Sequence, residues 1–222
     1  MSSHLTRDMQ SLHQHIMAMC TVVEDVVHRA VDELGRPDVA VSREIVDRDD
    51  EIDQWDVRIE EVCLKILALH APLADNLRRV AAVMKIAWEL ERMADVAVHI
   101  AERAAGLVGA PDIHLPEKLH EMARIALSML RSSLEAFVAK DSRLAREVCA
   151  QDDVVDALNR EIIGDLVQLM KRSPELVEPA MHLFSASRHV ERLADHATNI
   201  AEDVVYLVEG EIIRHRAEFW QR

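Results

Sequence analysis

The sequence predicts an all-α protein made of two tandem antiparallel three-helix bundles, and three observations support this prediction. Only five glycines and six prolines interrupt the 222 residues, which suits long helices and leaves little room for the turns of a sheet protein. Apolar residues recur three and four positions apart over long stretches, which is the period of an amphipathic helix. The chain also contains an internal repeat, and a repeat implies two halves of one design.

The repeat consists of two pairs of short strings. Glu91–Asp95 reads Glu-Arg-Met-Ala-Asp, and Glu191–Asp195 reads Glu-Arg-Leu-Ala-Asp, 100 residues later. Asp49–Asp53 corresponds in the same way to Asp152–Asp156, at an offset of 103. The first half therefore has three more residues between its two strings. Helices tolerate such a difference only in a loop or at a slipped end.

The first half is expected to contain three helices. Apolar spacing predicts the first over residues 5–34, and a Gly-Arg-Pro string stops it. Asp38 is the expected N-cap of the second helix, whose apolar positions continue to a turn near Pro72. The third helix is expected over about residues 77–109.

The second half is expected to repeat this order. Apolar positions predict the fourth helix over residues 119–134, and Asp141 is the expected cap of the fifth. Ser173 and Pro174 fit the cap and the first position of the sixth helix, which runs toward Gly210.

A short connection is expected between the halves. Residues 110–116 contain two prolines and follow the third helix. We therefore predict two domains, residues 1–110 and residues 111–222, and each is large enough to bury a core.

Composition excludes several classes of function. A net charge of −14 argues against nucleic-acid binding, because phosphates repel an acidic surface. Cys20, Cys63 and Cys149 are odd in number and far apart, so they fit neither a disulfide framework nor a Cys-x-x-Cys metal site. We expect buried thiols in a reducing cytoplasm. No signal peptide and no apolar run of bilayer length are recognisable, so no membrane insertion is expected.

Known catalytic patterns are also missing from the sequence. It shows no nucleophile–base set, no phosphate-binding glycine loop and no Cys/His zinc pattern. The chain is therefore expected to be a non-enzyme without an organic cofactor.

Acidic residues form four (Asp/Glu)-x-x-x-Asp pairs, and residues four apart lie on the same helix face. The pairs are Asp49 with Asp53, Glu91 with Asp95, Asp152 with Asp156, and Glu191 with Asp195. Two residues of a helical hairpin stand level when their mean position falls at the turn. The pairs of the first half have their mean at the turn near Pro72, and those of the second half have theirs at Ser173-Pro174. Four carboxylates are thus expected to meet across one groove in each bundle, beside the apolar seam.

Such groups require compensation, since carboxylates in contact repel by about 4 kcal/mol at an effective dielectric constant near 20. Oxygen-rich, partly hydrated sites suit hard cations such as ferric iron, magnesium, manganese or calcium. Four further residues lie beyond the pairs and are candidate additional ligands: His99, Asn199, Glu102 and Glu202. The alternative is a solvated, salt-bridged surface neutralised by nearby arginines, namely Arg48, Arg92, Arg188 and Arg192.

These strings resemble the PhoU family over almost the whole chain. The similarity includes the repeated acidic strings, the closing Val-Tyr-Leu-Val-Glu-Gly-Glu of residues 205–211, and the stretch of residues 63–86. The resemblance implies a cytoplasmic homodimer of helical bundles that acts as a negative regulator of phosphate uptake and phosphate-starvation signalling. The implied partners are the ATPase of the phosphate ABC transporter and a sensor histidine kinase.

The resemblance also implies a multinuclear metal cluster of iron, or of magnesium, manganese or zinc, on the acidic pairs. The residues that match are Asp49, Asp53, Glu91, Asp95, Asp152, Asp156, Glu191 and Asp195. The halves differ nearby, because His99 corresponds to Asn199 and Val96 corresponds to His196. The first site is therefore expected to differ from the second in metal or affinity.

Two other functions are weighed against the regulator. A ferritin-like di-iron carboxylate enzyme would take Glu-x-x-His motifs from one bundle, and Glu117-x-x-His120 matches this motif. This motif lies at a predicted helix start, away from the acidic pairs. An accessory protein of a different phosphate transporter is the third interpretation.

Overall fold

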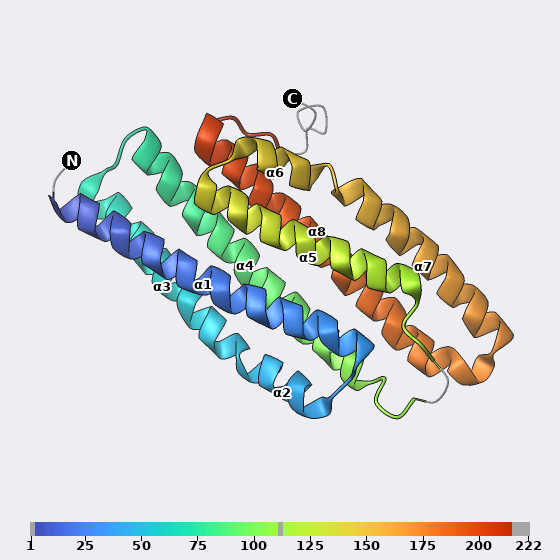
Figure 1. The fold of residues 1–222 in the computed structure, drawn as a ribbon. Helices are drawn as coiled ribbons and strands as arrows, with labels where there is room; N and C mark the ends of the chain where they lie inside the picture. Colours follow the sequence, from blue (N-terminus) through green and yellow to red (C-terminus); the bar gives the residue numbers. More distant parts are fainter. Residues whose placement is uncertain (1–2, 111–112, 215–222) are drawn as a thin grey trace.

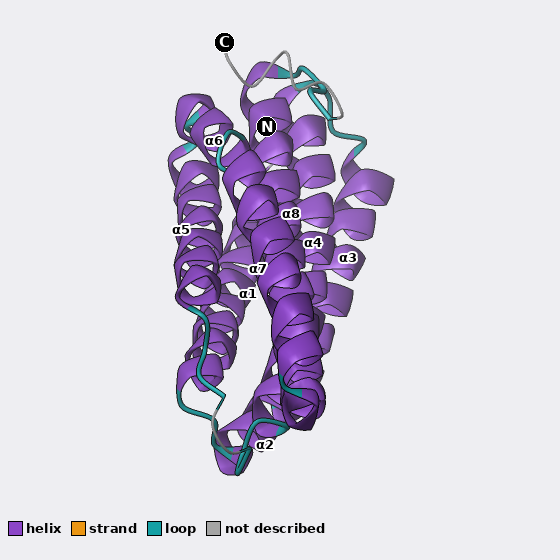
Figure 2. Cartoon of the chain, turned by 90° about the vertical axis from the view of Figure 1, so that its right-hand side faces the viewer, coloured by secondary structure: helices purple, strands orange, loops and turns teal. Residues whose placement is uncertain are grey.

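The computed structural model describes residues 3–110 and 113–214, and every regular element in these two ranges is helical (Figures 1 and 2). Its elements are α1 (Ser3–Gly35), α2 (Val39–Asp47), α3 (Asp49–His70), α4 (Asp75–Ala105), α5 (Glu117–Ala139), α6 (Ser142–Cys149), α7 (Asp152–Arg172), the 3-10 turn η1 (Pro174–Leu176) and α8 (Val177–Glu209). The predicted all-α fold is confirmed.

The third long helices of the two halves, α4 and α8, lie side by side in the middle of the molecule (Figure 1). They are antiparallel, since Lys85 of α4 pairs with Asp203 of α8, whereas His99 further along α4 stacks on His189. In the first half α1 and α3 pack on α4, and in the second half α5 and α7 pack on α8. Helices α1 and α5 also touch.

One continuous apolar core holds these helices together. The apolar positions predicted for the first helix are buried in α1, where Ile16 and Met19 are fully enclosed. Helices α4 and α8 bury Ala, Val, Ile, Leu and Met along their shared side. Burying one such large side chain contributes about 1.5–3 kcal/mol, so this core supplies the main driving force for folding.

The predicted count of six helices is wrong, because the second and fifth predicted helices are each broken in two. The first break is at Arg48, between α2 and α3, and the second is at Ala150 and Gln151, between α6 and α7. Apolar spacing continues across both breaks without glycine or proline, so periodicity could not reveal them. Each new helix begins with acids, which the positive end of the helix dipole favours. Asp49 and Asp152 are consequently the first residues of α3 and α7.

The predicted caps are confirmed at two of three positions. Asp38 accepts a hydrogen bond from the amide of Ala40 at 2.7 Å. Asp141 accepts from the amides of Arg143 at 2.9 Å and Leu144 at 3.0 Å. Ser173 makes no side-chain capping bond, because Pro174 opens a 3-10 turn that leads into α8.

The end of the sixth helix is predicted correctly, whereas the end of the third is not. Helix α4 ends at Ala105 and turns follow, so the end predicted near residue 109 is too late. Helix α8 ends as expected before Gly210, whose φ of 77° lies in the left-handed region that favours glycine. The predicted linker includes residues 111–112, which lie outside the described residues. The domain boundary at residue 110 stays a prediction.

The Asp141 cap can be tested by substitution. We expect Asp141→Ala to lower the free energy of unfolding by about 1 kcal/mol, because two amides at the start of α6 lose their acceptor. Urea denaturation followed by circular dichroism measures this change. Asp141→Asn keeps an acceptor oxygen and should retain most of the stability. A loss as large as that of the alanine variant would contradict the capping role.

Candidate functional site

The first carboxylate site consists of Asp49 and Asp53 on α3 with Glu91 and Asp95 on α4. Asp49 and Glu91 are half-buried, whereas the other two are exposed. Burial raises the pKa of Asp49, and the charges of Asp95 and Asp53 raise it further. Burial also raises the pKa of Glu91, with added repulsion from Asp95 and Asp56. The two acidic pairs therefore face each other, as the hairpin argument predicts.

The second carboxylate site has the same design, with Asp152 and Asp156 on α7 and Glu191 and Asp195 on α8. Burial, followed by the charges of Asp195 and Asp156, raises the pKa of Asp152 to about 6. A hydrogen bond from Thr198 Oγ1 to Asp152 Oδ1, 3.3 Å long, opposes that rise. Desolvation by the surrounding protein and the charge of Glu191 raise the pKa of Asp195. Repulsion within this site is thus incompletely compensated.

Nearby arginines neutralise the carboxylates of the two sites only in part. Arg188 Nη1 lies 3.1 Å from Glu191 Oε1 and neutralises one acid of the second site. Arg48 instead pairs with Asp25 and lies 3.8 Å from Glu51, neither of which belongs to an acidic pair. In the first site the charge of Arg92 opposes the rise in the pKa of Glu91 without outweighing burial, so arginines neutralise neither site fully.

Carboxylate oxygens in this number have the chemistry of a hard-cation site. Among the described residues, however, no three His, Cys, Asp or Glu side chains are placed so that they could hold a metal ion. Binding would require the exposed carboxylates to turn toward the half-buried ones. The assignment of these eight residues as metal ligands therefore stays a prediction.

The four candidate additional ligands are engaged in different contacts. His99 stacks on His189, with ring centroids 5.1 Å apart, and its charge slightly opposes the rise in the pKa of Asp49. Glu102 is exposed and pairs with Arg103 at 3.2 Å. Asn199 contacts Glu89 of the other half, whereas buried Glu202 lies 3.7 Å from Arg214 of its own half.

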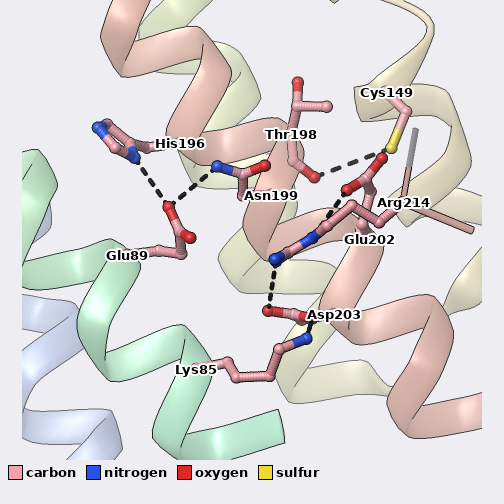
Figure 3. Close-up of polar contacts among 9 residues, drawn as sticks. All are labelled: Lys85, Glu89, Cys149, His196, Thr198, Asn199, Glu202, Asp203 and Arg214. Atoms are coloured by element: carbon pink, nitrogen blue, oxygen red, sulfur yellow. Dashed lines mark hydrogen bonds and ion pairs between the residues drawn. The ribbon is translucent and has the colours of Figure 1, made fainter. Parts of the chain in front are cut away.

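A polar network between α4 and α8, which Figure 3 shows, is the feature that sequence reasoning missed. Glu89 Oε2 lies 2.8 Å from His196 Nδ1 and accepts from Asn199 Nδ2 at 3.1 Å. Burial raises the pKa of Glu89, but these hydrogen bonds outweigh burial and lower it. Asn199 is therefore a bridge between the two halves.

The same network contains an ion pair whose carboxylate is buried. Asp203, only 2% exposed, pairs with Lys85 across the interface, and Arg214 lies 3.6 Å from it. Arg214 also lies 3.7 Å from buried Glu202. Burial raises the pKa of Asp203 despite these cations. Differences between the repeats signal the network, since Ser185 stands where the first half has Lys85.

The Glu117-x-x-His120 motif lies apart from both carboxylate sites. Glu117 and His120 are on the first turn of α5, and His120 lines a cavity with Arg36 and Arg124. Nothing in this arrangement brings the motif toward the acidic pairs.

The sequence matches a known family twice, once in each half. The model of the PhoU domain matches residues 16–104 and residues 119–204. The chain belongs to the PhoU family. Each matched segment contains one of the two carboxylate sites, so the internal repeat is a repeat of the PhoU domain.

Individual PhoU relatives match over almost the full length. The chain is 35% identical over 212 residues to a protein of Aquifex aeolicus named phosphate-specific transport system accessory protein PhoU homolog, with 96% of each chain covered. It is 33% identical over 217 residues to the homologue of that name in Pseudomonas aeruginosa, covering 96% of this chain and 89% of the relative.

Solved PhoU structures share this fold. The crystal structure of PhoU from Pseudomonas aeruginosa superposes with a TM-score of 0.88 at 32% identity, covering 93% of this chain and 99% of the other. The phosphate transport system regulatory protein PhoU from Streptococcus pneumoniae gives 0.86 at 29% identity, covering 94% and 98%. In the described part of this chain, none of the helices combines the length and apolar character that a bilayer span requires.

The raised pKa of Asp152 in the second site predicts that the free energy of unfolding depends on pH. Asp152 has a pKa of about 6 in the fold and 3.8 as its ordinary value, so the folded state binds its proton more tightly. Ionisation of Asp152 therefore reduces stability as the pH rises from about 4 to 6, and the full cost is present at pH 7. Without metal, Asp152→Asn should raise the free energy of unfolding at pH 7 by about 1 kcal/mol, after allowance for solvent screening.

Urea denaturation in the presence of EDTA, at pH 7 and pH 4, measures the effect, and the gain should shrink at pH 4. Asp153→Asn is the matched control, because exposed Asp153 also lies in the first turn of α7. An equal gain in this control would show that net charge, and not the second site, is responsible.

Proposed function

We propose that this PhoU-family chain is a non-catalytic negative regulator of phosphate uptake and of the phosphate-starvation response, acting in the cytoplasm. The observation that carries the proposal is the near full-length similarity to proteins named phosphate-specific transport system accessory protein. Its two carboxylate sites support the same function, since they lie beside the apolar core and remain open to solvent. Changes there can alter binding without dismantling the fold.

The proposed action is that of an adaptor. One partner is the ATPase of the phosphate ABC transporter, and the other is a sensor histidine kinase. Two similar acidic sites on one molecule offer separate docking points for cation-bridged or arginine-bearing surfaces. The adaptor is proposed to work as a homodimer, which sedimentation equilibrium of the purified protein measures directly.

Bound cations are part of the proposal. A multinuclear cluster of iron, or of magnesium, manganese or zinc, would neutralise the repulsion among the carboxylates and present positive charge to a partner. In the first site the half-buried Asp49 and Glu91 would hold the cations, and in the second site Asp152 and Glu191 would do so. The exposed acids of each site would supply further ligands.

Metal binding is tested by neutralising one site. In the variant with Asp152→Asn, Asp156→Asn, Glu191→Gln and Asp195→Asn, bound metal should fall by the share of the second site, while the first site remains loaded. Elemental analysis after reconstitution with ferrous, manganese, magnesium or zinc salts measures this. A control variant with Asp153→Asn, Glu161→Gln and Asp165→Asn removes three charges from α7 at positions outside the site. Unchanged metal content in the first variant would support the solvated-face alternative.

Regulation is tested by deletion in the source organism. We expect the phosphate-starvation response to stay switched on in phosphate-rich medium, because the restraining protein is absent. Transcript levels of starvation-induced genes measure the effect, and the wild-type gene supplied in trans should restore repression. Normal repression in the deletion strain would contradict the regulatory function. Oxygen consumption by the ferrous-loaded protein would then test the di-iron enzyme, and the neighbouring genes would indicate whether another phosphate transporter is served.

The adaptor is tested by capture. Neutralising Glu91, Asp95, Glu191 and Asp195 together should weaken pull-down of the ATPase and the kinase without loss of helicity, because all four lie outside the core. Partners that bind this variant as tightly as the wild type would show that another surface is used.

A further inference from the structure

Two adjoining cavities form a groove at the end of the molecule where α4 begins, and nothing proposed above uses it. The larger has a volume of about 430 Å³ and lies between α1 and α4. The smaller, of about 260 Å³, lies between the start of α4, the α5–α6 turn and the end of α8. Asn76 and Arg79 line both, so the cavities adjoin. Their combined size is in the usual range for small-molecule sites, about 300–1,000 Å³.

The charge of this groove is opposite to that of the chain. None of the residues lining the larger cavity is acidic, although the chain carries a net charge of −14. Arg78, Arg79 and Lys140 meet at the smaller cavity, against a single carboxylate, Asp75. We call the surface that these two cavities form the basic groove.

Two of its cations lack compensation. Within the described ranges, the side chains of Arg79 and Lys140 have no hydrogen-bond or ion-pair partner, whereas Arg78 pairs with Asp75. The Nε of Arg78 is nevertheless shielded from solvent and has no partner among the described residues. The charges of Arg79 and Lys140 are therefore the ones that a bound anion would neutralise.

The groove offers two kinds of recognition. Guanidinium groups present several N–H donors in a plane and match phosphate oxygens, and the lysine adds a mobile point charge. The larger cavity has a buried thioether, Met9, and is lined by the amide side chains of Gln10 and Gln14. Methionine packs well against aromatic rings, and amides can both donate to and accept from the edge of a heterocycle.

The basic groove is separate from the carboxylate sites. Arg79 precedes Glu91 by 12 residues on α4, which corresponds to about 18 Å along the helix. Leu207, which lines the smaller cavity, follows Asp195 by 12 residues on α8, so a ligand in the groove leaves both carboxylate sites accessible.

We propose that the basic groove binds a phosphorylated small molecule of nucleotide size. Its phosphate groups lie against Arg78, Arg79 and Lys140, and its ring lies over Met9 in the larger cavity. This binding is independent of the metal and of the partners proposed above. It would make the protein responsive to a phosphorylated metabolite at a position remote from the carboxylate sites.

The test is calorimetric titration of the full chain with ATP, ADP, AMP, pyrophosphate and adenosine as probes. EDTA is present throughout, because a cation on the carboxylates would otherwise bind phosphate and mimic the result. We expect ATP to bind with a Kd below about 1 mM, more tightly than either adenosine or pyrophosphate. The affinity should fall as salt is raised, since the contacts are charged.

Substitutions assign the binding to the groove. Arg79→Gln should weaken ATP binding by about tenfold, the loss expected for one charge-assisted hydrogen bond. Lys140→Asn should weaken it about threefold. Lys140 has a φ of 54°, and asparagine tolerates this left-handed conformation, so the second variant removes charge without adding backbone strain. Arg172→Gln, at the far end of α7 (Figure 1), is the control and should bind as the wild type does.

Three results would overturn the proposal. The first is that no phosphorylated probe binds. The second is that pyrophosphate binds as tightly as ATP, which would leave the larger cavity without a role. The third is that Arg79→Gln and Lys140→Asn, both folded by circular dichroism, bind ATP as tightly as Arg172→Gln does.

Discussion

The antiparallel packing of α4 on α8 is the contact on which the rest of this structure depends. These helices are the corresponding elements of the two PhoU domains, and each also packs against the other helices of its own bundle. Their apolar sides are continuous with one core. The pair of half-buried Lys85 with buried Asp203 supports their register, because loss of the lysine would leave the enclosed carboxylate with less compensation. The positions of α1, α3, α5 and α7 follow from that register.

Corresponding positions of α4 and α8 meet across this interface, since residue 89 contacts residue 199 and residue 99 contacts residue 189. Two identical helices would make each of these contacts twice. The halves diverge at these positions. Glu89 meets His196 and Asn199 at one end, while His189 stacks on His99 at the other. The repeat therefore differs at these contact positions, whereas the acidic pairs are present in both halves.

The carboxylate sites have a different physical basis. Breaks before Asp49 and Asp152 place the first acid of each pair at a helix N-terminus, where the dipole favours negative charge. Burial and mutual repulsion nevertheless raise the pKa of Asp152 and Glu191. The fold holds charges together at a cost in stability. The cation binding proposed above would relieve this repulsion and would thereby link binding to stability.

The sequence by itself determined the helical class, the two similar halves, the caps at Asp38 and Asp141, and the pairing of acidic strings across each hairpin. These features depend on local spacing and on the length of chain between two points, which are properties of the sequence. Only the tertiary structure decided where the long helices break, that Asn199 bridges to Glu89 instead of lining a carboxylate site, and that Arg78, Arg79 and Lys140 form one groove. These outcomes depend on contacts between segments far apart in the chain, so no local pattern contains them.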